Sequence, residues 1–298
     1  MEKVQINDDL YFSRIILGMM RTKAWGYTAN QLLGYIEQSI ALGVTTFDHA
    51  DLYGGYECEA IFGEALRLKP ELRQQIQLVT KCGIIFPTPR MPQYTIKAYD
   101  HTKEHIIRSV DNSLANLNTD YIDVLLLHRP NPLMDPEVVA DAFHTLKEQG
   151  KVRAFGVSNF TPAQMNMLSA YTPLVTNQIL LSLYSYNHLM DGTLEQALEK
   201  KFPIMAYHPV AGGKIHTASD EKAVQLKEAL ESVSKEMDGN DIDSLMYAWL
   251  LALPARIMPI VGSGKIERLK SAVAALDMRL TRDQWFTLYK AARGVDVP

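Results

Sequence analysis

Residues 45–54 read Thr-Thr-Phe-Asp-His-Ala-Asp-Leu-Tyr-Gly, and this stretch indicates how the rest of the chain folds. A β-branched and apolar run stops at Asp48, and Tyr53 follows five residues later. β-branched and aromatic side chains favour strands, whereas Gly54 and Gly55 favour a turn. A buried strand that ends in a carboxylate, with a tyrosine on the next loop, is typical of a parallel α/β barrel, because such barrels carry their reactive groups at the carboxyl ends of the strands.

The same alternation of strand and helix continues along the chain in both directions. Eight short apolar runs predict strands at residues 14–18, 44–47, 76–80, 122–127, 152–157, 174–177, 204–206 and 257–261. Segments with helical spacing lie at residues 29–42, 59–68, 102–117, 136–149, from 161 onward, 192–200, 221–237, 242–253, 266–276 and 281–292. Alternating strands and helices imply a parallel sheet, and eight units imply a closed (β/α)8 TIM barrel of the α/β class. An open doubly wound sheet is disfavoured because no G-x-G-x-x-G motif follows a strand.

Two features extend the barrel. Short apolar runs around Asn7-Asp8-Asp9 predict an N-terminal β-hairpin, and the last helices exceed what eight units need. The chain shows no linker and no shift in composition, so we expect one domain over residues 1–298. The proline-rich stretch 84–100 and residues 209–218 are expected to be loops that shape the pocket.

Composition excludes several classes of protein. The 298 residues carry 30 basic and 34 acidic side chains, a net charge of −4 without long runs of one sign, which argues against nucleic-acid and membrane partners. Two cysteines, Cys58 and Cys82, fit a reducing compartment, and the N-terminus has acidic residues where a signal peptide is apolar. We expect a cytoplasmic protein, a monomer or weak oligomer, without a metal site, since the histidines lack metal-ligand spacing.

Polar residues end nearly every predicted strand. They are Asp48, Lys81, His128, Ser158-Asn159, Gln178, Tyr207 and Gly262-Ser263-Gly264. Asp48 and Lys81 end adjacent strands, so an ion pair that Tyr53 can reach is expected. A nearby ammonium lowers the pKa of a tyrosine and suits it to acid–base catalysis near neutral pH. His128, one strand further, can bond to the same substrate oxygen.

Five short motifs in this order resemble the aldo-keto reductase superfamily, and in particular its bacterial oxidoreductase branch. They are Phe-Asp-x-Ala-x-x-Tyr-Gly, Val-Thr-Lys, Leu-Leu-x-His, Gly-Val-Ser-Asn-Phe and a late Gly-Ser loop, and the resemblance runs from Gly18 to about Leu276. Each motif alone has a plain structural explanation, such as a helix-entry turn or a surface charge. Together, at successive strand ends, they favour the resemblance.

The resemblance implies an NADP(H)-dependent enzyme that reduces a small carbonyl substrate, an aldehyde or ketone, to an alcohol. It implies a catalytic tetrad of Asp48, Tyr53, Lys81 and His128, with Tyr53 as the proton donor. Cofactor contacts are implied at Gly18, Met20, Asp48, Ser158, Asn159, Gln178, Tyr207, Gly262, Ser263, Gly264, Lys265 and Arg268. The helix that begins near Ile266, with two adjacent cations, suits the 2′-phosphate of NADP(H).

Three departures from the pattern affect the pocket. Gly18-Met19-Met20-Arg21 replaces the usual loop after the first strand, His208-Pro209-Val210 replaces Ser-Pro-Leu, and Ser271-Ala272 replaces a Glu-Asn pair near the adenine. Two other functions stay open at this point. One is an auxiliary subunit that senses the nicotinamide cofactor with little turnover, and the other is an isomerase or lyase on the same barrel.

Overall fold

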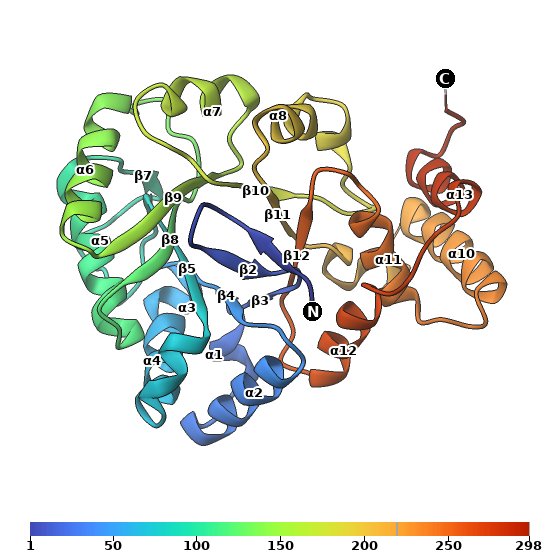
Figure 1. Ribbon diagram of the computed structural model, residues 1–298, viewed down its shortest axis with the longest axis horizontal. Coiled ribbons are helices and arrows are strands. Elements are labelled where there is room, and N and C mark those ends of the chain that lie inside the picture. Colours follow the sequence, from blue (N-terminus) through green and yellow to red (C-terminus); the bar gives the residue numbers. More distant parts are fainter. Residues whose placement is uncertain (219, 298) are drawn as a thin grey trace.

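The computed structural model describes residues 1–218 and 220–297, and in them eight parallel strands close into a barrel (Figure 1). The strands follow one another around the barrel in chain order: β3 (Ile16–Gly18), β4 (Thr46–Asp48), β5 (Gln77–Cys82), β8 (Ile122–Leu127), β9 (Val152–Ser158), β10 (Asn177–Leu180), β11 (Ile204–Tyr207) and β12 (Ile257–Val261). All eight strand pairings are parallel, and β12 returns to β3. The predicted (β/α)8 barrel is therefore confirmed.

Helices surround the barrel. The longer ones are α2 (Ala29–Ala41), α4 (Cys58–Arg67), α5 (Lys103–Leu117), α6 (Pro136–Glu148), α7 (Pro162–Ser169), α8 (Thr193–Lys200), α10 (Glu221–Glu236), α11 (Ile242–Leu251), α12 (Ile266–Ala274) and α13 (Arg282–Arg293). Thr28, Thr161 and Thr281 each start a helix with a reciprocal capping box to a glutamine three residues later. The pair α10 and α13 lies side by side at the edge of the molecule (Figure 1).

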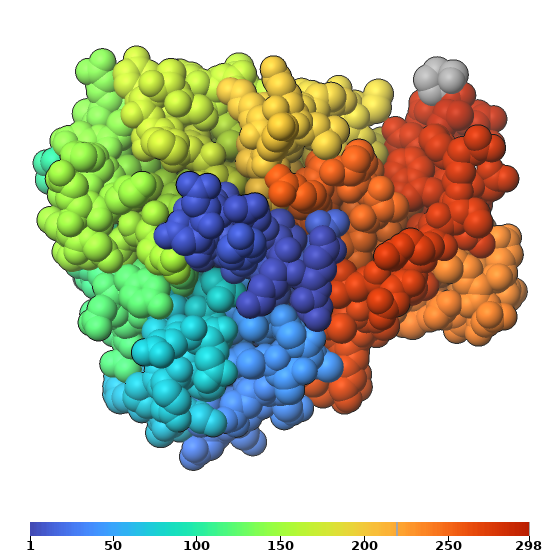
Figure 2. Space-filling view, viewed as in Figure 1, coloured from blue at the N-terminus to red at the C-terminus, as the bar shows by residue number. Residues whose placement is uncertain are grey.

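The predicted hairpin closes the amino end of the barrel. Strands β1 (Lys3–Gln5) and β2 (Tyr11–Ser13) pair antiparallel, and the hairpin covers the centre of this face in Figure 2. Phe12 is fully buried in the same apolar cluster as Val79 and Met205 from the barrel interior. Because this end is plugged, a ligand can enter the barrel only from the carboxyl ends of the strands.

Four predicted details were wrong. Residues 209–218 are not a simple loop, because a 3-10 turn (Ala211–Gly213) and the short helix α9 (Lys214–Thr217) lie within them. The stretch 84–100 is not all loop, because β6 (Ile84–Ile85) and β7 (Ala98–Tyr99) pair antiparallel inside it. The strand predicted at 174–177 lies at Asn177–Leu180, where its backbone pairs with β11. The barrel also supplies partners for two of its side-chain amides: Asn177 donates to Phe160 O at 2.8 Å, and Gln178 donates to Asp48 Oδ1 at 2.7 Å. Tyr53 begins a short helical turn, α3 (Tyr53–Tyr56), which is interrupted by left-handed glycines.

Candidate active site

A buried lysine organises the carboxyl end of the barrel. Lys81 Nζ donates to Asp48 Oδ1 at 2.8 Å, to His49 O at 2.6 Å and to the Tyr53 hydroxyl oxygen at 3.1 Å, and its side chain is fully buried. Asp48 and Lys81 come from neighbouring strands β4 and β5, as the sequence predicted. Asp48 Oδ2 also lies 2.9 Å from Nζ, so the three protons of the ammonium group face three acceptor groups: one carboxylate, one main-chain oxygen and one hydroxyl.

Since Lys81 can only donate, Tyr53 receives its hydrogen bond on oxygen and keeps its own O–H free. Tyr53 lines a cavity at the barrel mouth, so a molecule bound there can accept that hydrogen bond. The geometry suits the tyrosine to donate a proton.

Burial sets the ionisation of this pair. Burial alone would lower the pKa of Lys81, but the neighbouring Asp48 carboxylate and Tyr53 outweigh it, so the pKa is raised and the ammonium form persists. Burial raises the pKa of Tyr53, and Lys81 only partly offsets this effect. The expectation that Lys81 brings the pKa of Tyr53 below its ordinary value was therefore wrong. Tyr53 is a neutral phenol at pH 7, which fits an acid better than a base.

His128 completes the predicted tetrad. Its ring lies edge-on to Tyr53, with centroids 5.8 Å apart. Its Nδ1 is buried and has no hydrogen-bond partner among the described residues. Burial, followed by the charges of Lys81 and Arg129, holds the pKa of His128 well below its ordinary value. A neutral imidazole can donate one hydrogen bond to a carbonyl oxygen.

A chain of hydrogen bonds links the residues predicted to hold a nicotinamide. Tyr207 donates through its hydroxyl to Asn159 Oδ1 at 2.8 Å, and Asn159 Nδ2 donates to Ser158 Oγ at 2.7 Å. Ser158 Oγ donates in turn to the main-chain oxygen of Gln178 at 2.9 Å. Asn159 adopts a left-handed backbone, with φ of 59°, which an asparagine tolerates well. These side chains are therefore fixed in place.

One cavity of about 290 Å³ collects most of the predicted site residues. They are Gly18, Met20, Asp48, Tyr53, His128, Ser158, Asn159, Gln178, Tyr207, Gly262, Ser263 and Arg268. Residues 209, 210, 212, 213 and 216 also line it, so the segment 209–218 shapes the pocket, whereas no residue of 84–100 lines it. A side chain at Gly18 would meet Ile260 at 2.7 Å, which explains the glycine where β3 and β12 meet.

The sequence patterns did not mark every residue of this cavity. They missed Arg129, Asp243 and Tyr247. Arg129 directly follows His128, so its position carried a signal. Asp243 and Tyr247 lie on α11, far along the chain, and no local pattern marks them.

The predicted phosphate loop divides into two parts. Gly262, Ser263 and Arg268 line the cavity, whereas Gly264 and Lys265 do not. Two tyrosines brace the loop from behind: Tyr35 donates to Ser263 O and Tyr27 donates to Gly264 O, each at 2.6 Å. Their rings pack against each other and against Trp25, whose atoms a side chain at Gly264 would meet at 2.8 Å.

The described residues give little support for a metal site or a reactive thiol. Within residues 1–218 and 220–297, no group of three histidine, cysteine or acidic side chains could hold a metal ion. Burial raises the pKa of Cys82 well above its ordinary value, so its thiol stays protonated and unreactive.

Among the residues that the structure describes, no helix is long and apolar enough to span a membrane.

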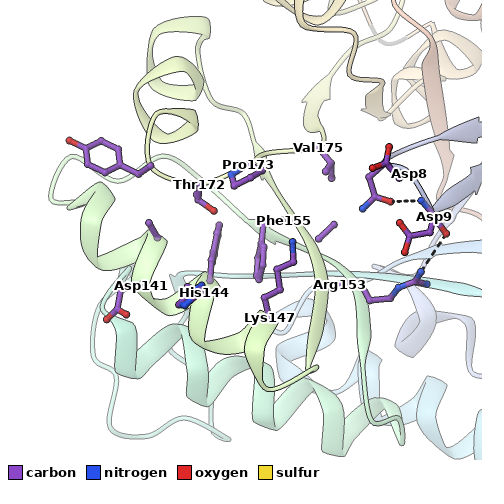
Figure 3. A pocket seen from close by; sticks show the side chains of 15 residues that line it. Asp8, Asp9, Asp141, His144, Lys147, Arg153, Phe155, Thr172, Pro173 and Val175 are labelled. Atoms are coloured by element: carbon purple, nitrogen blue, oxygen red, sulfur yellow. Dashed lines mark hydrogen bonds between the residues drawn. The ribbon is translucent and has the colours of Figure 1, made fainter.

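A larger cavity of about 650 Å³ lies at the opposite end of the barrel (Figure 3). It sits between α6, the start of β9 and the turn of the N-terminal hairpin, where Arg153 reaches the main-chain oxygen of Asp9. None of the predicted site residues lines it. Reactive groups of α/β barrels stand at the carboxyl ends of the strands, so this cavity is not the active site.

Comparisons with known proteins agree with the fold and with the family that the sequence resembles. The profile of the Aldo/keto reductase family matches residues 14–293, and the chain belongs to this family of oxidoreductases. It is 53% identical, over the full length of both chains, to an uncharacterized oxidoreductase, YcsN, of Bacillus subtilis. It is 40% identical, again over both full lengths, to a 6-dehydroglucose reductase of Agrobacterium fabrum.

Among solved structures, a glycerol dehydrogenase of Gluconobacter oxydans shares the fold, with a TM-score of 0.86 at 24% identity, over 99% of this chain and 97% of that one. The family membership supports carbonyl reduction as the general class of reaction.

Proposed function

We propose that this protein is an NADPH-dependent reductase of aldehydes and ketones in which Tyr53 donates the proton. The observation that carries the proposal is the Tyr53 hydroxyl, which accepts from Lys81 at 3.1 Å and keeps its O–H directed elsewhere, beside a neutral His128. Both side chains line the same cavity, and their ring centroids are 5.8 Å apart. A carbonyl oxygen placed between them would receive two hydrogen bonds.

The residues of the chain then have distinct tasks. When bound, the nicotinamide supplies a hydride to the carbonyl carbon. His128 orients the carbonyl oxygen, and Tyr53 passes its proton to that oxygen as negative charge develops. Lys81 stabilises the phenolate that remains on Tyr53, and Asp48 holds Lys81 in its charged form.

The described residues fit a nicotinamide dinucleotide. Ser158, Asn159 and Gln178 offer fixed amide and hydroxyl groups for the carboxamide, and Tyr207 has its hydroxyl engaged, which leaves its ring to stack. Arg268 and the start of α12 offer a cation and free backbone N–H groups at the far end of the cavity, which suits a phosphate monoester. NADPH is therefore favoured over NADH.

The relatives bear on the alternatives and on the choice of substrate. Oxidoreductase names at 53% and 40% identity favour an enzyme over the cofactor-sensing subunit or the isomerase. The name 6-dehydroglucose reductase makes a polyhydroxylated aldehyde a sensible first substrate to assay.

The decisive experiment compares Tyr53→Phe with the wild type. We expect the variant to lose NADPH oxidation with a panel of aldehydes by about 10²–10⁴-fold, which is the usual contribution of general acid catalysis. NADPH binding, followed by fluorescence titration, should persist. Tyr11→Phe, whose side chain on β2 is 43% exposed, is the matched control and should keep full activity. Turnover of Tyr53→Phe close to the wild type would overturn the mechanism.

A further inference from the structure

Arg129 directly follows His128 at the carboxyl end of β8, and its side chain lines the same cavity. The residue is half-buried, and among the described residues its guanidinium makes no ion pair and no hydrogen bond. Partial burial of an unpaired cation is unfavourable, and a bound anion relieves it through charge-assisted hydrogen bonds. The position of Arg129 beside the catalytic histidine indicates that this anion belongs to the substrate.

At this wall of the cavity, no described carboxylate balances the charge of Arg129. Lys97, on the segment that leads into β7, is exposed to solvent and does not line the cavity. Lys81 is different, because the Asp48 carboxylate balances its charge at 2.8 Å. The substrate end of the cavity is thus locally positive in a chain of net charge −4.

The cofactor does not account for Arg129. The phosphate groups of a dinucleotide have their own cations on the other side of the cavity, where Arg268 lies in the first turn of α12 and Arg21 lies near His208. Arg129 instead adjoins His128, at the wall where the carbonyl is reduced. An anion held by Arg129 must therefore be part of the same molecule as the carbonyl or lie beside it.

We propose that Arg129 binds a carboxylate or phosphate group of the substrate, so that the enzyme prefers carbonyl compounds with a negative charge a few atoms from the carbonyl. The inference rests on the proposed reductase function for its kinetic part. The guanidinium fork matches the two oxygens of a carboxylate or phosphate, which a lysine at the same place would not reproduce.

Matched substrate pairs test the preference. They are 4-oxobutanoate against butanal for the carboxylate, and glyceraldehyde 3-phosphate against glyceraldehyde for the phosphate. We expect kcat/KM for at least one anionic member to exceed that of its neutral partner by 10-fold or more, through a lower KM. In Arg129→Gln this ratio should fall at least 10-fold, and Arg129→Lys should restore part of it. Arg282→Gln, with an 85% exposed side chain on α13, is the control and should keep the ratio.

Equilibrium binding decides the inference even if no aldehyde is reduced. Succinate and glycerol 3-phosphate, which cannot be reduced, are titrated by calorimetry into the wild type and into Arg129→Gln in the presence of NADPH, so that neither ligand reacts. At least 10-fold weaker binding to the variant supports the inference, and it identifies which anion is recognised. Equal binding to both proteins, or equal kcat/KM within each substrate pair for the wild type, overturns it. Lack of turnover with all four aldehydes alongside Arg129-dependent binding would overturn only the reductase function.

Discussion

The side-chain amide of Gln178 donates to Oδ1 of Asp48 at 2.7 Å, although 130 residues separate the two in the chain. Asp48 thereby serves two partners, since the same carboxylate oxygen accepts from Lys81. Gln178 also belongs to the group that is proposed to hold the nicotinamide. The cofactor end of the cavity and the catalytic ion pair are therefore joined by one buried hydrogen bond.

Removing the charge of Asp48 should destabilise the fold as well as the site. In Asp48→Asn the buried Lys81 loses its counter-ion, and we expect unfolding free energy to fall by about 3–5 kcal/mol. In this variant, burial would lower the pKa of Lys81, because the Asp48 carboxylate that outweighs the effect of burial in the wild type is absent. Chemical denaturation measures the first effect. Asp48→Leu with Lys81→Met removes both charges and should regain stability without regaining turnover. If the double variant were as unstable as Asp48→Asn, the unpaired charge would not be the cause.

Two buried acids behind the site should make stability depend on pH. Burial, followed by the charge of Glu59, raises the pKa of Asp51 well above its ordinary value, and burial also raises the pKa of Glu59, which accepts from Thr80 at 2.6 Å. A raised folded-state pKa gives stability that is complete below the unfolded pKa of about 4 and is lost as pH rises through the folded values.

Replacing Asp51 and Glu59 with amides should therefore remove this loss of stability at high pH. The double variant Asp51→Asn, Glu59→Gln should melt about 2–4 °C above the wild type at pH 8, a shift that corresponds to roughly 1 kcal/mol. The difference should shrink at pH 5. Asp283→Asn, with an 89% exposed side chain, is the control. A difference in melting temperature that does not change with pH would contradict the assignment.

The tyrosines behind the phosphate loop should tune cofactor choice. Tyr35→Phe leaves Ser263 O without its 2.6 Å donor, a loss of about 1 kcal/mol, or roughly fivefold in Kd. We expect NADPH binding to weaken by that factor and NADH binding to change less, because the loop leads to the proposed 2′-phosphate site. Fluorescence titration of both cofactors measures it, with Tyr11→Phe as the control. Equal weakening of both cofactors would show that the loop does not sense the extra phosphate.

Two helical glycines should respond in opposite ways to alanine. Gly34 on α2 has no atom within 4 Å of the position of a Cβ, so Gly34→Ala should stabilise the protein by about 0.5–1 kcal/mol. Gly63 on α4 would place its Cβ 1.9 Å from the main-chain oxygen of Asn116 on α5. Gly63→Ala should therefore destabilise by several kcal/mol, about 3 or more, as overpacking against a backbone does. Thermal melts of the pair test this, and a stable Gly63→Ala would mean that α4 and α5 can separate.

Much of the fold was predictable because its signals are local. The helix starting after Thr28 follows from its capping residues and apolar spacing, and the strand before Asp48 follows from its β-branched run. The order of strand ends then predicted that Asp48 and Lys81 would meet, since neighbouring parallel strands place their carboxyl ends together.

Tertiary structure decided what depends on surroundings that come from distant parts of the chain. The sequence placed Lys81 near Tyr53, but only the buried setting showed that desolvation outweighs the ammonium and keeps Tyr53 a phenol. The sequence placed Lys265 with Arg268, but only Arg268 lines the cavity. Arg129 directly follows His128 in the sequence, but its lack of a counter-ion depends on where the acidic side chains lie in the folded protein. Spacing along the chain fixes which residues reach the mouth of a barrel, whereas pKa values and free charges depend on every group packed around them.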